Sequence, residues 1–392
     1  FNAYTNFQSA EEYNNYRDLY LKQYMDRIER INQYVSGDGK LYIIPIRMST
    51  EPVTQPNLYG DKPNVASYIP WDYYVELGCP ELENDQDLLD MLELMQKNHP
   101  VTEDGKKVYA FSLFKDWENE YMSLAARIVE THGVNTETDS YFWNYKKDEP
   151  ERLMENQGAY FKALELYYEA NKRGLLDPGS GVQSYEEFSK KVESKQVLYL
   201  WYAFMVGYYN KLGDSDGYAY IVVPEEYGGG SYKDGFCQAN DSILDEKNVN
   251  PNTGEPYFAW NWTTTRAWNQ GETEKKWTLH FGEESPAKYL EEQDRLKVIA
   301  GSDYIRPKES VELSNIRQKC SNIIKEYSWK MIFAENDKKF MQYWHDCRAL
   351  LYGSGYEQEE AKDLEYLNQI QKHRKMILEE YSTNTDSDYS NE

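Results

Sequence analysis

The sequence lacks most of the signatures that catalytic and metal-binding proteins carry. Its four cysteines lie far apart with no CxxC pair, so neither a zinc site nor a thioredoxin-type motif is supported. The five histidines show no HExxH or other paired ligand spacing, and no GxxxxGK[ST] or GxGxxG loop is present. We therefore expect no catalytic residue, no metal and no cofactor. A pair of glycosidase carboxylates stays open, because their separation is set by the fold and none of the 67 acidic residues stands out.

Long apolar runs and an excess of positive charge are also missing. The longest candidate run, residues 197–209, is shorter than the roughly 18 apolar residues that a membrane helix needs, which excludes an integral membrane protein. With 43 basic against 67 acidic residues, the net charge of −24 disfavours nucleic acid and other polyanionic ligands. Phe1 opens the sequence without an initiator Met, a signal peptide or a lipid-attachment cysteine, so we expect a removed targeting segment or a fragment.

Aromatic residues are abundant instead. The chain holds 37 Tyr, 13 Phe and 10 Trp, together 15% of its residues. Tyr and Trp combine a flat apolar face with a polar tip, and they suit surfaces that bind sugars, peptides or other amphipathic ligands. A Tyr bias with a purely structural cause remains the alternative.

The patterns predict short buried strands that alternate with helices, which indicates an α/β layer architecture followed by a helical C-terminal block. The predicted strands cover residues 41–44, 108–113, 197–200 and 218–223. The predicted helices cover residues 11–34, 72–77, 84–95, 118–132, 157–173 and 184–193, with helix again over most of the last 80 residues. Residues 225–307 are aromatic and loop-like, and the sequence assigns no helix or strand to them. The polar tail, 382–392, is expected to be disordered.

Three aromatic clusters carry the prediction of a ligand site. They are Tyr141–Tyr145, the pair Trp201 and Tyr202, and Tyr257–Trp262 with Trp260 and Trp262. Ligands of open α/β sheets bind beyond the carboxyl ends of strands, where Trp201 and Tyr202 follow one predicted strand and Arg47 follows another. For Trp143 and Trp201, ligand binding and core packing both stay open, whereas Trp329 and Trp344 on helical faces are expected in the core.

Several motifs, taken in order, resemble the extracellular solute-binding proteins of family 1, the carbohydrate-binding lipoproteins of ABC transporters. These are Gly37–Pro45 (the DGKxYxxP pattern), Asp72–Gly78 (DWLxxLG), Asn84–Met95 (TxDEL), Tyr167–Pro178 (YxxGLIDP) and the C-terminal helices from Phe340. The chain departs from that pattern at Pro70-Trp71, where many relatives have Arg-Lys. It also departs at residues 99–107, which lack most oxygen ligands of the family's calcium loop.

The resemblance implies a two-lobed periplasmic-binding-protein-like fold of type II with a helical C-terminal block. Lobe one would comprise residues 1–113 with a return segment at about 228–307, and lobe two residues 114–227 with helices at about 308–381. Crossovers would fall near 113–117 and 223–227. The ligand would lie between the lobes, among Trp71, Asp72, Trp117, Trp143, Tyr145, Trp201, Tyr202, Trp260, Trp262 and Arg47.

The function implied is capture of an oligosaccharide by hinge closure and its delivery to an ABC permease, with no catalysis. The protein would be an extracellular monomer held at a bacterial cell surface by a lipid anchor that is absent from this chain. A glycan-acting hydrolase or lyase remains the alternative, as does a surface glycan-binding protein built from helical repeats. Whether the ligand is a sugar or a peptide stays open.

Overall fold

The computed structural model describes residues 65–145, 147–209, 218–220, 236–238, 271–293, 297–299 and 306–388, with scattered positions at 9, 29, 32, 33, 37, 38, 40, 42, 302 and 304. Predictions that lie outside these residues include the strand at 41–44, most of the helix at 11–34, and the site residues Arg47, Trp260 and Trp262. Among the described helices, none has both the length and the apolar character that crossing a membrane requires.

Short antiparallel strands form the centre of the described fold. β1 (Val65–Pro70) lies between β5 (Leu200–Tyr202) and β6 (Tyr218–Tyr220), with Tyr68 opposite Leu200 and Tyr220. A meander joins β2 (Val134–Thr136), β3 (Tyr141–Asn144) and β4 (Glu149–Arg152), and β7 (Phe236–Gln238) pairs in parallel with β8 (Lys297–Ile299). The predicted strand at 108–113 is reduced to two parallel bridges, Tyr109 to Val197 and Phe111 to Leu176.

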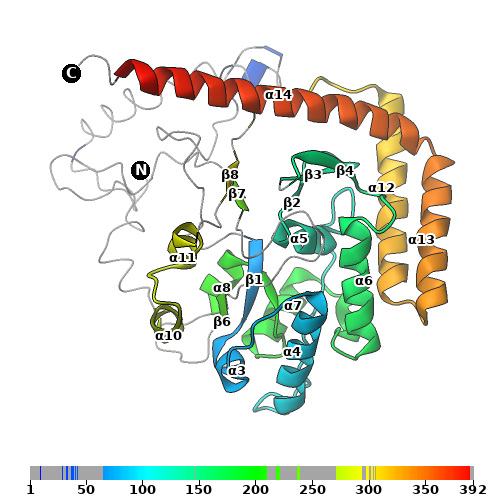
Figure 1. Ribbon diagram of the computed structural model, residues 1–392. Helices are drawn as coiled ribbons and strands as arrows, with labels where there is room; N and C mark the ends of the chain where they lie inside the picture. The colour runs from blue at the N-terminus through cyan, green and yellow to red at the C-terminus, as the bar shows by residue number, and fades with distance from the viewer. Residues whose placement is uncertain are drawn as a thin grey trace.

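Helices surround this centre (Figure 1). They are α3 (Trp71–Glu76), α4 (Asp85–Asn98), α5 (Ser123–Thr131), α6 (Ala159–Lys172), α7 (Tyr185–Glu193), α8 (Ala203–Tyr209), α10 (Glu272–Phe281) and α11 (Pro286–Glu292), with the 3-10 turn η2 (Pro178–Gly181). The helices predicted at 72–77, 84–95, 157–173 and 184–193 are confirmed within a few residues. The helix predicted at 118–132 begins later, at Ser123. Asn84 caps α4, because its side chain accepts the Asp87 N–H at 3.0 Å.

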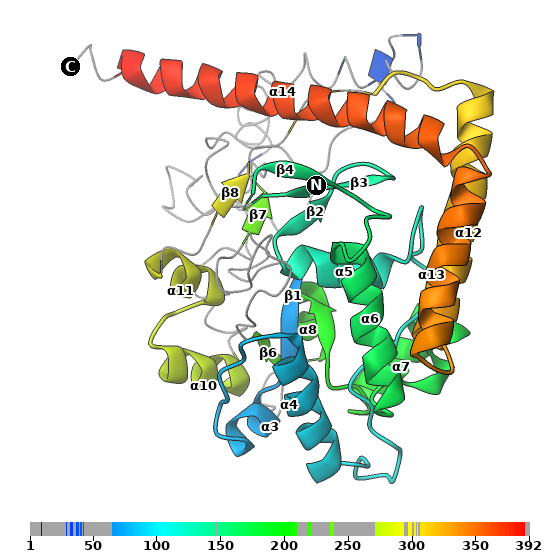
Figure 2. The ribbon, with the colours of Figure 1, turned by 45° about the vertical axis from the view of Figure 1, so that its right-hand side comes forward.

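The C-terminal block consists of α12 (Val311–Ile332), α13 (Asp337–Tyr352) and α14 (Tyr356–Asp388). α12 packs on α13 and α6, whereas α14 runs across the molecule above β3 and β4 (Figures 1 and 2). Trp329 and Trp344 are buried, as predicted. The disordered tail predicted from residue 382 is wrong as far as Asp388, because extending an existing helix by one residue costs far less than nucleating a new one.

One continuous core joins segments on both sides of the predicted lobe boundary at residue 113. Phe111 lies with its ring centroid 5.4 Å from that of Tyr167 and 5.0 Å from that of Tyr199, and all three rings are fully buried. The two-lobe division given above therefore stays a prediction, and the described residues show no break in the core at this point. Cys79, Cys320 and Cys347 are free thiols.

Candidate functional site

Four partly exposed aromatic rings gather around the C-terminal end of β5. Trp117 lies 4.4 Å from Tyr185, 5.9 Å from Tyr202 and 6.0 Å from Phe204, measured between ring centroids. The four rings belong to the core's partly buried margin rather than to its interior. We call them the Trp117 surface.

Local structure holds these rings in place. Ser184 caps α7 in a reciprocal capping box with Glu187, which fixes Tyr185 at the first helical position. The Tyr185 N–H donates to the Asp116 carboxylate at 2.7 Å, and this bond ties α7 to the segment that carries Trp117. Beneath them, buried Phe114 meets Trp117 edge-on at 4.8 Å and Tyr185 at 5.1 Å. Buried side chains therefore support the Trp117 surface from below.

A charged pair on α5 adjoins the Trp117 surface. Arg127 Nη1 lies 2.6 Å from a Glu130 oxygen, and the two side chains are 20% and 11% exposed. The Arg127 guanidinium lies 6.0 Å from the centre of the Tyr202 ring. Burial raises the pKa of the Tyr202 hydroxyl to about 12, and of the two neighbouring charges Glu130 raises it further while Arg127 lowers it. Tyr202 is therefore a neutral hydrogen-bonding group at physiological pH.

Of the ten predicted site residues, the structure brings Trp117 and Tyr202 together in this surface. Trp201 has no exposed surface: its indole N–H donates to the Tyr167 hydroxyl at 2.9 Å, and its ring packs among Tyr199 and Phe188. The alternation of side chains along β5 explains the difference, because neighbouring residues of a strand point to opposite faces. The prediction that Trp201 faces a ligand is therefore corrected to a core position.

Trp71 and Asp72 lie against α10. Trp71 is 1% exposed, with its ring 5.5 Å from His280 and 6.1 Å from Phe281. The Asp72 carboxylate pairs with Lys276 at 2.7 Å. Both side chains hold α3 to α10. Burial of Trp71 corrects its prediction as a ligand contact to a core position, whereas Asp72, whose side chain is 36% exposed, stays a predicted contact.

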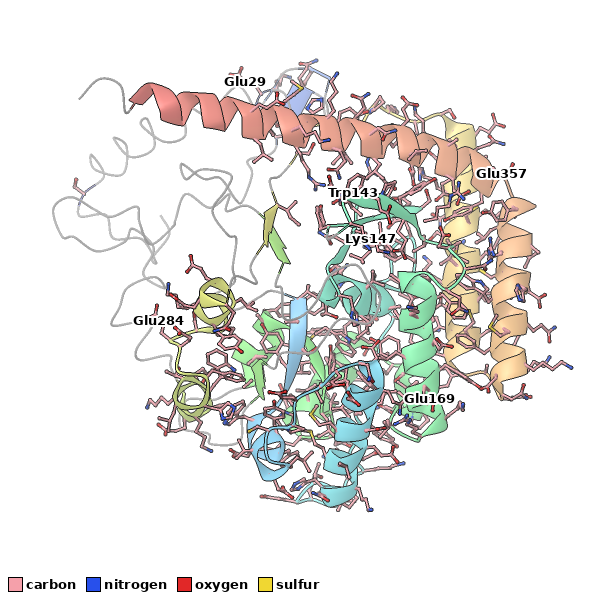
Figure 3. All side chains as sticks on the ribbon, in the orientation of Figure 1. Glu29, Trp143, Lys147, Glu169, Glu284 and Glu357 are labelled. Carbon is pink, nitrogen blue, oxygen red and sulfur yellow. The ribbon has the colours of Figure 1, made fainter. Side chains whose placement is uncertain are left out.

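Trp143 lies beneath α14 (Figure 3), and Tyr145 belongs to the same buried cluster. Trp143 is 9% exposed and Tyr145 4%, and with Tyr141 and Leu367 they form a small core of their own. The Tyr145 hydroxyl donates to Glu137, which also pairs with Arg374 of α14 at 2.9 Å. Burial, with Glu137 alongside, raises the pKa of Tyr145. Leu367 and Arg374 of α14 pack against this cluster, so the two rings help to dock the helix, and their role as ligand contacts stays a prediction.

Sequence reasoning missed Tyr185, Phe204, Arg127 and Glu130. Three of them had a signal in the sequence: Tyr185 is the second residue of the helix predicted at 184–193, and Arg127 and Glu130 are opposite charges three residues apart on one helix. Nothing local indicated that Tyr185 would contact Trp117 or that Arg127 would lie over the ring of Tyr202.

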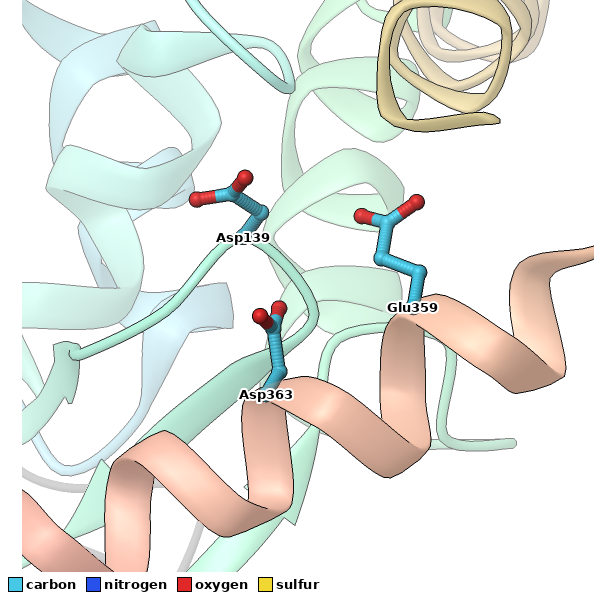
Figure 4. Close-up of side chains that lie close together, drawn as sticks. All are labelled: Asp139, Glu359 and Asp363. Atoms are coloured by element: carbon cyan, nitrogen blue, oxygen red, sulfur yellow. The ribbon is translucent and has the colours of Figure 1, made fainter. Parts of the chain in front are cut away.

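Three carboxylates converge where α14 passes the loop before β3 (Figure 4). Asp139, Glu359 and Asp363 each offer an oxygen, and these oxygens lie within 4.8 Å of one another. These residues are the group that could hold a metal ion in the described part of the chain. The Arg317 guanidinium, however, already lies 3.0 Å from Asp139 and 2.5 Å from Asp363, and it also pairs with Glu309 at 2.9 Å.

The cluster is therefore an ion-pair network with excess negative charge. Burial raises the pKa of Glu359 to about 8 and that of Asp139 to about 6, and Asp363 adds to both shifts against the opposing charge of Arg317. Asp363 also accepts hydrogen bonds from the backbone and hydroxyl of Ser140. The arrangement ties α14 to α12 and to the loop before β3.

The fold as a whole is that of the periplasmic-binding-protein-like solute-binding proteins. The chain is similar to an S. pneumoniae ABC-transporter substrate-binding protein, FusA, solved in complex with kestose: TM-score 0.56, 14% identity, covering 91% of this chain and 82% of that one. It is also similar to an HMO-binding, ABC-transporter-associated solute-binding protein from Bifidobacterium longum infantis (TM-score 0.51, 11% identity, 91% and 80% covered). A third similar structure is the alginate-binding protein AlgQ2, solved without calcium ion (TM-score 0.50, 12% identity, 92% and 81% covered).

Neither a family model nor a curated protein matches the sequence. The likeness to these solved structures therefore establishes the fold, and the chemistry of this chain's own site must carry the functional argument.

Proposed function

We propose that this protein is an extracellular solute-binding protein that captures an oligosaccharide at the Trp117 surface and delivers it to an ABC permease. The observation that carries the proposal is a cluster of partly exposed rings beside polar groups, on a fold shared with sugar-binding transport proteins. Indole and phenol faces stack on the C–H face of a sugar ring, while neighbouring polar groups bind its hydroxyls.

Hinge closure is the proposed mechanism of capture. Trp117 falls in the predicted crossover at 113–117, so its ring would move with the hinge and contact the ligand on closing. The protein would bind its ligand without altering it. A lipid anchor outside this chain would hold the protein at the cell surface, and permease subunits would be its partners.

The other functional classes remain as competing outcomes. A hydrolase or lyase would alter the sugar, whereas a binding protein returns it intact. A protein built from paired helices throughout conflicts with the sheet formed by β1, β5 and β6.

The test is a thermal-shift screen with short oligosaccharides and peptides, followed by chromatography of the incubated ligand. A ligand at 100 times its dissociation constant adds about 2.7 kcal/mol to the free energy of unfolding and raises the melting temperature. We expect an oligosaccharide to do so and to be recovered unchanged. Altered products would favour the enzyme, and stabilisation by peptides alone would overturn the proposed ligand class.

Trp117→Ala locates the site. Loss of a stacked ring should weaken binding by roughly 1–3 kcal/mol, by analogy with base–aromatic stacking. Tyr327→Ala is the matched control, because Tyr327 is a partly buried ring on α12 that packs against Tyr343 of α13. Equal effects of the two substitutions would contradict the assignment of the site.

A further inference from the structure

Arg127 and Glu130 are placed to govern the charge of whatever binds at the Trp117 surface. They lie one turn apart on α5, which packs against β5 and β1. Their ion pair measures 2.6 Å, and Arg127 reaches over the ring of Tyr202, which in turn contacts Trp117.

Glu130 and Arg127 differ in how many of their polar atoms have hydrogen-bond partners within the protein. The second carboxylate oxygen of Glu130 accepts a hydrogen bond from the Thr136 hydroxyl of β2 at 3.2 Å, so the carboxylate is held on both sides. Arg127 Nε is buried and has no hydrogen-bond partner among the described residues. A buried N–H without a partner costs about 1–3 kcal/mol, so the Arg127 side chain is less completely satisfied than that of Glu130.

The charged side chains around the Trp117 surface carry no net positive charge. Glu130 balances Arg127, and the Asp116 carboxylate that binds the Tyr185 backbone adds a further negative charge. Lys115 is directed to α12, with its amine 4.9 Å from the centre of the Trp329 ring. A ligand carboxylate brought here would lose its hydration without gaining an unpaired cation.

We propose that the Arg127–Glu130 pair is the specificity determinant of the Trp117 surface, selecting uncharged oligosaccharides and rejecting those that carry uronic acids. This inference rests on the proposed function. Arg127 offers its N–H groups to sugar hydroxyls, while Glu130 cancels the charge that would otherwise attract a carboxylate.

The test compares neutral oligosaccharides with uronates of the same length and linkage: gluco- with glucurono-, manno- with mannurono-, and galacto- with galacturono-oligosaccharides. Calorimetry gives the ratio of affinities within each pair. For the wild-type protein we expect at least one neutral sugar to bind about tenfold or more tightly than its uronate, a difference of about 1.4 kcal/mol.

Glu130→Gln leaves Arg127 as a net positive charge while keeping the shape of the side chain and an acceptor for Thr136. We expect the ratio to fall by about tenfold or to invert in favour of the uronate. The double variant Arg127→Gln with Glu130→Gln removes both charges, and we expect rejection of the uronate to return. A residue that merely supported the fold would not show this reversal.

Glu326→Gln is the control, because Glu326 makes a similar same-helix ion pair with Lys330 at 2.5 Å on α12. It should leave the ratio unchanged. An unchanged ratio in folded Glu130→Gln, or a wild-type preference for the uronate, would overturn the inference while the proposed function stands. If no oligosaccharide of either kind binds the wild-type protein, the proposed function itself fails.

Discussion

The tryptophan side chains of this protein differ in how far the indole ring is buried. Trp201 is enclosed on all sides and its N–H is bonded to Tyr167, whereas Trp117, nearby in space, keeps part of its ring open. A buried ring contributes to the free energy of unfolding, and an open one is available to a ligand. Substitution of Trp201 should therefore lower the stability of the fold, whereas substitution of Trp117 should lower the affinity for ligand.

Trp201→Ala should destabilise the protein by about 3–5 kcal/mol, because it removes a large buried ring and leaves a cavity. It also deprives the buried Tyr167 hydroxyl of a donor. Urea unfolding of wild type and variant measures the loss. A near-normal unfolding midpoint combined with lost sugar affinity would contradict the core assignment and restore the role in binding that the sequence suggested.

The raised pKa of the Glu359 carboxyl leads to a second prediction for a single residue. Its pKa is raised to about 8 by burial and by Asp363, so between the ordinary carboxyl pKa and about 8 the folded state holds a proton that the unfolded chain has lost. Stability should therefore fall as pH rises through this window. Glu359→Gln should flatten the fall and stabilise the protein at pH 8 by a few kcal/mol, since one pKa unit corresponds to about 1.4 kcal/mol.

Urea unfolding at pH 5 and at pH 8 checks this prediction. Glu326→Gln, an exposed carboxyl of α12, provides the comparison. If Glu359→Gln and the wild-type protein lose stability in parallel as the pH rises, Glu359 is not the group that holds the proton.

At the scale of secondary structure, helix ends were predictable because their signals are local. Asn84 caps α4 and Ser184 caps α7, each with its side chain bonded to the third helical residue. Strands were less predictable: β1 and the meander β2–β4 were missed. β1 is buried on both faces, so it shows no alternating pattern, and in β4 (Glu149–Arg152) polar residues are held by pairing with Trp143 and its neighbours.

Ser184→Ala should cost about 1 kcal/mol of stability and also weaken sugar binding, because the capping box fixes Tyr185 in the Trp117 surface. Ser310→Ala removes the corresponding cap of α12, where the Ser310 hydroxyl accepts the Leu313 N–H at 3.2 Å. It should cost similar stability and leave the affinity unchanged. Equal losses of affinity in both variants would show that the effect is general rather than local to the site.

At the scale of the whole molecule, the proposed mechanism requires a change of shape. A saturating oligosaccharide should reduce the radius of gyration in small-angle X-ray scattering, because two lobes close around it. Trp117→Ala at the same sugar concentration should keep the larger radius. Tight binding with an unchanged radius would refute hinge closure while leaving binding intact.

The sequence by itself determined the class of fold, the positions of α4, α6 and α7, the helical character of the C-terminal block, and the core roles of Trp329 and Trp344. Only the tertiary structure decided that Trp117 and Tyr202 share a surface while Trp201, Trp71 and Trp143 are buried. It also decided that Asp139 meets Asp363, more than two hundred positions away, at Arg317. Periodicity and capping act over a few residues, and the sequence shows them directly. Burial and charge neighbourhoods depend on which distant segments pack together, which is a property of the whole chain.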